Sequence, residues 1–255
     1  MVRALAALVF ALAMAACLPN GPPTGLGDGG APAATTPKKK PPPPPRASGS
    51  GPSGAADPLL TEVFEDEFER GTVGADWRML GPYWRIQDGK LCGQRAKNRG
   101  IWLAKRIPTN ARIEVEATAQ TAEGDLKMEV WGDGVSGATG NSYTNATSYL
   151  AIYGGWKNTV HELARLDEHG ADRKTVKVDP TDDDPRTKPV SAGQAYRFRI
   201  ERKDGKVVSF YVDDVLVHRF VDESPLEGAG HDHVGFNDWE AAVCFDHLRI
   251  TPLPG

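Results

Sequence analysis

The sequence is poor in cysteine, in long apolar runs and in positive charge. Its 255 residues include three cysteines, so at most one disulfide can form within the chain. The longest apolar run, LAALVFALAMAA near the N-terminus, is far too short to span a bilayer as a permanent helix. Removing the five basic and two acidic residues before Leu59 from the totals of 30 and 34 leaves 25 against 32, a net charge of −7. An acidic domain without a basic stripe argues against nucleic acid as a partner.

A helical period is missing too, and a two-residue period takes its place. In the segment from Gln194 to Thr251, Tyr196, Phe198 and Ile200 alternate with charged residues. Asp-Gly at 204–205 and Asp-Asp at 213–214 supply tight turns, which predicts a three-stranded meander followed by two further strands, with an irregularity at 246–247. ARIEVEATAQ at 111–120 has the same alternation, and HELARLDEH at 161–169 fits a strand better than a helical turn. We therefore predict an all-β fold, an antiparallel β-sandwich.

The first 17 residues have the composition of a targeting segment. A short basic head precedes the apolar run, which ends in Ala15-Ala16-Cys17. Small residues before a cysteine resemble the lipobox of bacterial lipoproteins, although Met14 stands where Leu is usual. The resemblance implies that Cys17 is lipidated and that the protein is anchored to a membrane of the bacterial cell envelope. The alternative is an ordinary signal peptide with an incidental cysteine.

Residues 18–58 cannot build a core, because they are mostly Pro, Gly, Ala and Ser with a basic knot at 38–40. Five consecutive prolines at 41–45 favour extended polyproline II. This segment is predicted to be a disordered tether, and residues 59–255 the folded domain. Its PPPPPR also resembles a ligand for Pro-binding grooves, but a spacer is the simpler interpretation.

Cys92 and Cys244 remain if Cys17 carries lipid, and each lies in a strand-like segment. In an oxidising envelope compartment such a pair can form a disulfide. The alternative is two separate buried thiols.

Several strand ends and turns together resemble a known family. FEDEFERG, YWRIQDGKLCG, the YRFRI strand, the YVDD turn, VGF and the closing FDHLRIT are similar to bacterial concanavalin A-like jelly rolls. The nearest group is the 3-keto-disaccharide hydrolase domain, which is family 16 glycoside hydrolase-like, together with laminarin-G-like modules. This resemblance covers nearly all of residues 59–251. It implies that the first and last strands pair and that a curved sheet forms a sugar-binding groove.

The catalytic strand of family 16 glucanases, Glu-x-Asp-x-Glu, is not found in this sequence. The nearest approach is Glu129-Val-Trp131-Gly-Asp133, whose odd positions share one face of a regular strand. Trp131 replaces the middle acid and Asp133 replaces the longer Glu. Glu129 and Asp133 are therefore weak catalytic candidates.

Carbohydrate binding needs rings that stack on pyranose faces and polar groups that meet hydroxyls. The aromatic candidates are Trp131, Tyr149, Tyr153 and Trp156, on two consecutive predicted strands. Arg165 and Asp167 on the next strand are the polar candidates. The alternative is that these rings belong to the core of the sandwich.

Two metal sites deserve consideration. His231-Asp232-His233 lacks a third zinc ligand and precedes a strand, where solvated histidines are commoner. The resemblance implies a structural calcium at Asp246, with Asp66 or Glu67 as the early acid, and the alternative is an Asp that caps a strand irregularity. No cofactor is required by any motif.

Three functions are compatible with this sequence. We expect a monomeric, envelope-anchored lipoprotein whose jelly-roll domain binds carbohydrate. A glycoside hydrolase acting on a small or keto-modified glycoside is the first alternative, and a structural or interaction lipoprotein without a ligand is the second.

Overall fold

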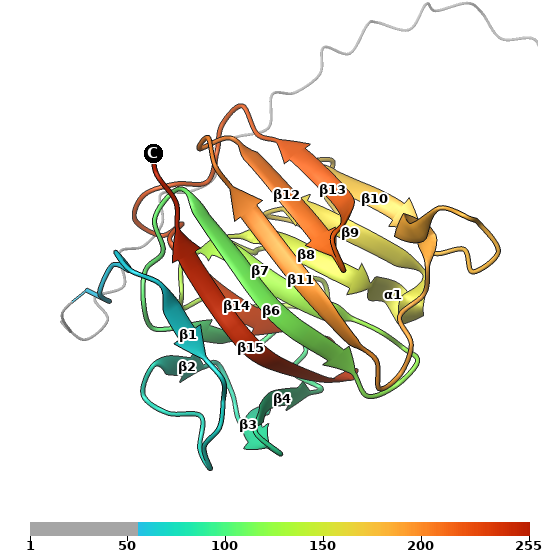
Figure 1. Cartoon of the computed structure of the whole chain (residues 1–255), viewed down its shortest axis with the longest axis horizontal. Helices are drawn as coiled ribbons and strands as arrows, with labels where there is room; N and C mark the ends of the chain where they lie inside the picture. The colour runs from blue at the N-terminus through green and yellow to red at the C-terminus, as the bar shows by residue number, and fades with distance from the viewer. Residues whose placement is uncertain (1–55) are drawn as a thin grey trace, which may run out of the picture. The chain divides into compact units, whose positions relative to one another are not determined.

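A computed structural model describes residues 56–255, in which two antiparallel sheets pack face to face (Figure 1). The predictions for the signal segment, for lipidation of Cys17 and for most of the tether lie outside these residues. Asp57 and Pro58, assigned above to the tether, are bound to the domain, since Arg78 and Arg106 hold Asp57 and Arg106 N–H donates to Pro58. No helix among the described residues is long and apolar enough to cross a membrane.

The first sheet has the strand order β13-β12-β11-β6-β15-β4-β3, and β1 also pairs with β15. Its strands are β1 (Phe64–Asp66), β3 (Trp84–Gln87), β4 (Lys90–Gln94), β6 (Ala111–Ala119), β11 (Ala195–Arg202), β12 (Val207–Val212), β13 (Val215–Val221) and β15 (Ala242–Pro252).

The second sheet has the order β10-β9-β8-β7-β14-β5-β2. Its strands are β2 (Trp77–Met79), β5 (Ile101–Leu103), β7 (Leu126–Gly132), β8 (Tyr149–Gly154), β9 (Val160–Arg165), β10 (Arg173–Lys177) and β14 (His233–Asn237). One short turn of helix, α1 (Gly155–Asn158), joins β8 to β9, and the 3₁₀ turn η1 (Pro185–Thr187) lies between β10 and β11.

The alternation read from the sequence determines which side chains face the core. In β6, alternate residues are fully buried while those between them are half-exposed. β11, β12 and β13 form the predicted meander, and 161–165 lie in strand β9 as expected. The prediction of an all-β antiparallel sandwich is confirmed.

Two bulges interrupt this alternation. In β15 the register with β6 shifts between Asp246 and Arg249, and His247 has φ 51°, at the predicted irregularity. In β7 the register with β14 shifts opposite His233/Val234, and Trp131 has φ 53°. Val130 and Trp131 are consequently both packed in the core between the sheets.

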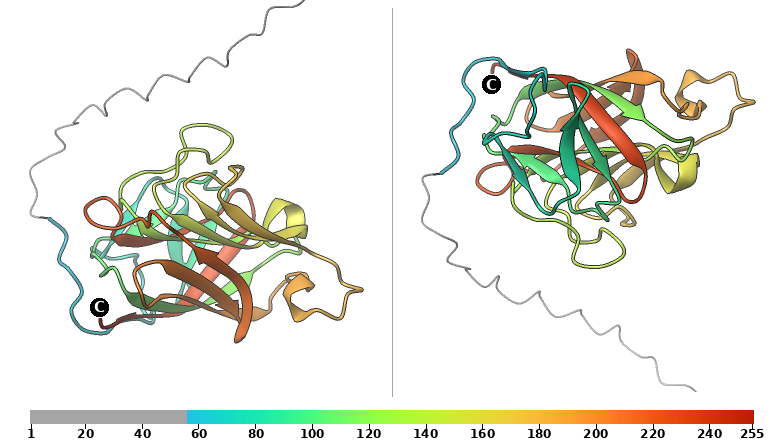
Figure 2. Two further views of the ribbon diagram at one scale, coloured as in Figure 1. Left: turned by 90° about the horizontal axis from the view of Figure 1, so that it is seen from above. Right: turned by 90° about the horizontal axis from the view of Figure 1, so that it is seen from below.

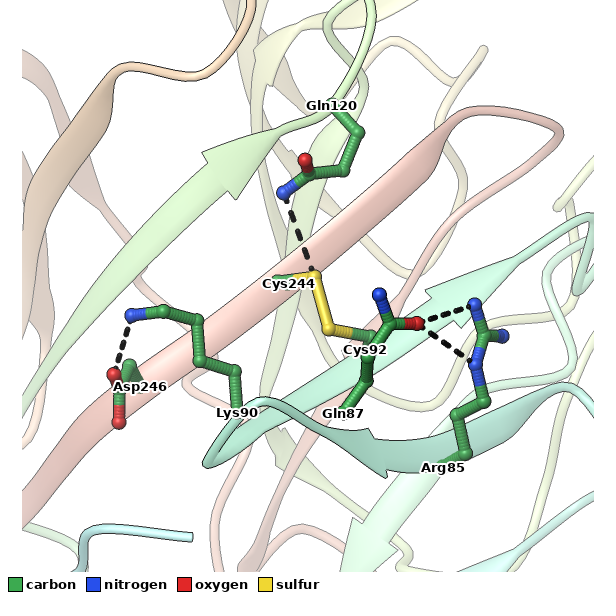
Figure 3. The surroundings of a disulfide bond; sticks show 7 residues. All are labelled: Arg85, Gln87, Lys90, Cys92, Gln120, Cys244 and Asp246. Atoms are coloured by element: carbon green, nitrogen blue, oxygen red, sulfur yellow. Dashed lines mark hydrogen bonds and ion pairs between the residues drawn. A yellow bond between two sulfur atoms is a disulfide. The ribbon is translucent and has the colours of Figure 1, made fainter. Parts of the chain in front are cut away.

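Cys92 and Cys244 form a disulfide, so the prediction of a bridge is confirmed. They lie directly opposite each other in β4 and β15, with Cα atoms 4.1 Å apart. Figure 3 shows Lys90 Nζ donating to Asp246 Oδ2 at 2.5 Å beside the bridge. The disulfide therefore joins two strands, β4 and β15, that backbone hydrogen bonds already pair.

A second apolar cluster lies on the face of the second sheet that points away from the first sheet. Leu150 and Ile152 of β8 are buried there under Tyr143 and Ala146. Both covering residues come from the β7–β8 connection, which lies on the outer side of the second sheet and is yellow-green in Figure 2. The β7–β8 connection thus covers part of the outer face of the second sheet, and the neighbouring part of that face is not covered by it.

Candidate functional site

A pocket of about 500 Å³ opens on the outer face of the second sheet, beside this cover. It is lined by the start of β7, by α1, by the turn that follows β14 and by residues 141–142 and 168–169. Chain segments far apart in the sequence therefore converge on one hollow.

Lys127 of β7 lines the pocket and is only 2% exposed. Its Nζ donates to Asn98 Oδ1 at 2.7 Å and to Glu168 Oε2 at 3.1 Å, and lies 4.0 Å from Asp125 Oδ1. Burial by itself would lower the pKa of Lys127, but the carboxylates of Asp125 and Glu168 outweigh it and raise that pKa. The surrounding carboxyl groups therefore favour the charged form of this buried lysine.

The two acids beside Lys127 have opposite shifts. Burial dominates at Asp125 and raises the pKa of its carboxyl. At Glu168 burial is outweighed by the charge of Lys127 and by the hydrogen bond from Tyr143 N–H, which together lower the pKa. Carboxyls whose pKa values are pushed apart in one pocket are the pattern that acid–base chemistry requires.

Trp156 of α1 is 39% exposed and lines the pocket. It begins three consecutive residues in the left-handed region, with φ values of 50°, 59° and 63° for Trp156, Lys157 and Asn158. The amide of Asn158 holds this turn, since it donates to Val190 O at 2.8 Å and accepts from Val190 N–H at 2.9 Å. A non-glycine residue in the left-handed region costs about 1 kcal/mol or more. The hydrogen bonds of Asn158 to Val190 help to offset this cost and hold the turn in place.

Trp239, in the turn between β14 and β15, is the second tryptophan of the pocket. The backbone N–H of Trp239 donates to Asp125 Oδ2 at 2.6 Å, and its backbone C=O accepts from the backbone N–H of Lys97 at 2.9 Å. The Lys97 ammonium lies 4.2 Å from the centroid of the indole ring. Backbone bonds on both sides fix the position of this residue at the pocket wall.

Three of the four aromatic residues predicted to bind sugar lie in the core, so the expectation of their exposure is wrong. Trp131 and Tyr149 have no exposed surface and Tyr153 has 4%. Trp131 donates to Pro108 O and carries the Arg202 guanidinium over its ring at 4.1 Å. The bulge in β7 turns Trp131 inward, and the alternation of β8 does the same for both tyrosines.

The two polar candidates also lie outside the pocket lining. Arg165 Nε donates to Asp222 Oδ2 at 2.8 Å and a terminal nitrogen donates to Ser224 O, so this side chain ties β9 to the segment after β13. Asp167 accepts from His169 N–H within its own turn. Of the six predicted binding residues, only Trp156 lines the pocket.

Glu129 and Asp133 do not form a catalytic pair at this pocket. Glu129 is 1% exposed and accepts hydrogen bonds from Tyr143, Ser148 and Asn237, and burial raises its pKa to about 7. Asp133 accepts from the N–H groups of Val135 and Ser136 and shapes the β7–β8 connection. Neither carboxyl lines the pocket, since Glu129 lies beneath the cover and Asp133 is used in a turn.

Of the two early acids proposed as calcium ligands, Glu67 lies close to Asp246, whereas Asp66 is engaged by other residues. Both carboxylate oxygens of Asp66 are occupied, by the guanidinium of Arg70 and by Trp77 Nε1, so Asp66 does not fit a cation site. Asp246 lies instead with Glu67 and His247, the one group among residues 56–255 whose donor atoms come close enough for a metal ion. The ammonium of Lys90 bonds Asp246 there, which competes with a cation for that carboxylate.

The histidines of the His231-Asp232-His233 segment have separate partners. His231 Nδ1 contacts Thr147 O at 2.7 Å, while His233 lies between Asp57 and Asp232. These contacts fix the loop before β14 and do not gather a third nitrogen or sulfur ligand.

Sequence reasoning missed Trp239, Lys127 and Asp125. Trp239 stands in a turn flanked by acids, NDWE, and a ring in a polar turn is a signal of binding that could have been used. Lys127 and Asp125 have no such signal, because charged residues in a strand or just before it are usually exposed to solvent.

Known protein structures are similar to this chain in fold. No protein-family model matches the chain, and no curated protein matches it. The carbohydrate-binding module CBM66 from Bacillus subtilis superposes with a TM-score of 0.51 at 16% identity, covering 69% of this chain and 95% of the module. A β-1,3-1,4-glucanase (lichenase) from a mouse hindgut metagenome gives 0.51 at 9% identity, covering 75% and 99%. These likenesses confirm the predicted concanavalin A-like jelly roll.

Proposed function

We propose that this domain binds carbohydrate in the pocket beside Lys127. The observation that carries the proposal is a pocket of about 500 Å³ lined by two tryptophans and by charged and amide side chains. Indole rings stack on the C–H faces of pyranoses, while Asn98, Asp125 and Glu168 offer acceptors or donors for hydroxyl groups. The carbohydrate-binding module and the glucanase of the same fold support this choice.

The lipobox-like Ala15-Ala16-Cys17 supports the rest of the proposal. The protein is lipidated at Cys17 and is held as a monomer on a membrane of the bacterial envelope, with its domain presented to glycans. Mass spectrometry of the mature chain tests the anchor, and an unmodified Cys17 contradicts it.

Binding of a glycan array by the purified chain, followed by calorimetry on the best ligand, tests the central claim. Trp156→Ala and Trp239→Ala should each weaken binding tenfold to a hundredfold, since burying one large apolar side chain contributes ~1.5–3 kcal/mol. Tyr211→Ala is the matched control, because this half-buried ring lies on β12 of the other sheet and is covered by Arg199 at 3.8 Å. Loss of binding in the control variant alone, or no effect in either tryptophan variant, contradicts the proposed site.

Glycoside hydrolysis is the second candidate, and the opposite pKa shifts of Asp125 and Glu168 favour it. Asp125 with its raised pKa would donate a proton to the leaving oxygen, and the ionised Glu168 would take a proton from the water that attacks the anomeric carbon as the glycosidic bond breaks. Release of reducing ends from the ligands found above tests this candidate. It fails if binding occurs without products, or if Asp125→Asn leaves the rate of product release unchanged.

A further inference from the structure

The charges around the pocket are unbalanced. Four carboxyl groups line it, those of Glu123, Asp125, Glu168 and Glu240, against the two ammonium groups of Lys127 and Lys157, while the Lys97 ammonium beside the pocket pairs with Glu240. The Lys127 ammonium is already hydrogen-bonded to Glu168. An incoming anion would therefore meet an excess of negative charge, and an incoming cation would be attracted.

Two of these carboxylates hold free acceptor capacity near Trp239. Asp125 uses Oδ2 to accept the Trp239 N–H, while among the described residues its Oδ1 accepts no hydrogen bond and lies 4.0 Å from Lys127 Nζ. Glu123 is exposed at the rim and has no hydrogen-bond or ion-pair partner among the described residues. These oxygens can accept from a ligand N–H without breaking an existing contact.

The protein itself places a cation on Trp239. The ammonium of Lys97 lies 4.2 Å from the indole centroid and pairs with Glu240. The Lys97 side chain is 40% exposed and is not part of the pocket lining, so it can leave the ring without disturbing the core. The indole of Trp239 is thus a cation–π surface whose present occupant is replaceable.

We propose that the pocket prefers sugars that carry a free, protonated amino group, whose ammonium replaces that of Lys97 on the Trp239 ring between Asp125 and Glu240. This inference rests on the proposed function and names its ligand class. Amino sugars offer both elements that the pocket would contact, a pyranose face for Trp156 and a cation for Trp239. N-acetylated, neutral and acidic sugars lack the cation.

Calorimetry of the full chain with glucosamine oligomers, N-acetylglucosamine oligomers of the same length and galacturonic acid oligomers tests this. The amino sugar should bind about fivefold more tightly than its acetylated counterpart, which corresponds to ~1 kcal/mol, and the acidic oligomer should bind weakest. Lys97→Met frees the ring and should tighten amino-sugar binding further. Lys90→Met is the matched control, since Lys90 pairs with Asp246 outside the pocket.

The double variant Glu123→Gln/Glu240→Gln changes only exposed side chains and should reduce the preference to near equality. Acetylated oligomers that bind as tightly as amino sugars overturn the inference and leave the proposed function standing. Absence of binding to every sugar overturns both. A lysine-rich peptide that binds as tightly as the amino sugar also overturns the inference, because the pocket would then recognise a cation without a pyranose.

Discussion

At the scale of single residues, Lys127 is the most consequential side chain of the pocket. A buried ammonium is stable only because carboxylates surround it, and those carboxylates equally depend on the ammonium. Lys127→Met removes the charge while it keeps most of the apolar stem, and it leaves Glu168 without its counter-ion. We expect a loss of ~3–5 kcal/mol in the free energy of unfolding, measured by urea denaturation.

Lys90→Met is the control for this loss. Lys90 is 39% exposed and pairs with Asp246 near the surface, and exposed pairs contribute ~1 kcal/mol or less. A Lys127→Met protein as stable as the Lys90→Met protein would mean that the acids around Lys127 take up protons instead of remaining charged.

The same scale explains why the fold could be predicted and most of the site could not. Alternation places side chains correctly in β6 and β11, because these strands run without interruption. The same rule places Trp131 on the face of Glu129. Trp131 is itself the bulge residue, with φ 53°, and its side chain lies in the core instead. Nothing in the letters around Trp131 marks that bulge, which the pairing of β7 with β14 determines.

At the scale of elements, the disulfide joins β4 and β15 across a sequence separation of 152 residues. The chain-entropy model gives ~5 kcal/mol as an upper figure for so long a loop. Because backbone hydrogen bonds already pair the two strands in the folded state, the bridge acts mainly on the unfolded chain. Replacing Cys92 and Cys244 by alanine should lower the free energy of unfolding by ~2–5 kcal/mol.

Denaturation with and without a reducing agent checks this expectation within one experiment. The parent protein should lose stability when it is reduced, and the Cys92→Ala/Cys244→Ala protein should be indifferent to the reagent. A parent protein that unfolds at the same urea concentration in both conditions would show that the bridge contributes nothing.

The position of the pocket is a second property of elements. It forms where β7 begins and β8 ends, because the β7–β8 connection closes the rest of the outer face over Leu150 and Ile152. The family resemblance predicts a groove on a curved sheet. The cover restricts the opening to one end, and its packing depends on long-range contacts that no local pattern encodes.

At the scale of the whole molecule, buried carboxyl groups and buried histidines change the free energy of unfolding in opposite directions as pH changes. Burial raises the pKa of Glu129, Glu162 and Asp238 to about 7. The folded state favours their protonated forms, so the stability that they contribute is lost as pH rises from their unfolded values through 7. Burial lowers the pKa of His161 and His218 to about 4, which gives the opposite slope over the same range. Between pH 4 and 7 these two sets of buried groups therefore act on the stability of the protein in opposite directions.

A difference between variants isolates one side of this balance. His218 of β13 is 5% exposed, and among the described residues its Nε2 has no hydrogen-bond partner, so His218→Phe removes the ionisable group and keeps an aromatic ring at this buried position. The neutral form of His218 is favoured in the fold, so its stability is fully present above pH 6.5 and is lost as pH falls toward 4. Relative to the parent, the His218→Phe protein should gain up to ~3 kcal/mol over that interval, measured by urea denaturation at each pH.

His247→Gln is the control of opposite sign, because the carboxylate of Glu67 raises the pKa of this exposed histidine and stabilises its charged form at low pH. A His218→Phe protein whose stability runs parallel to that of the parent from pH 7 to 4 would mean that His218 is charged in the fold.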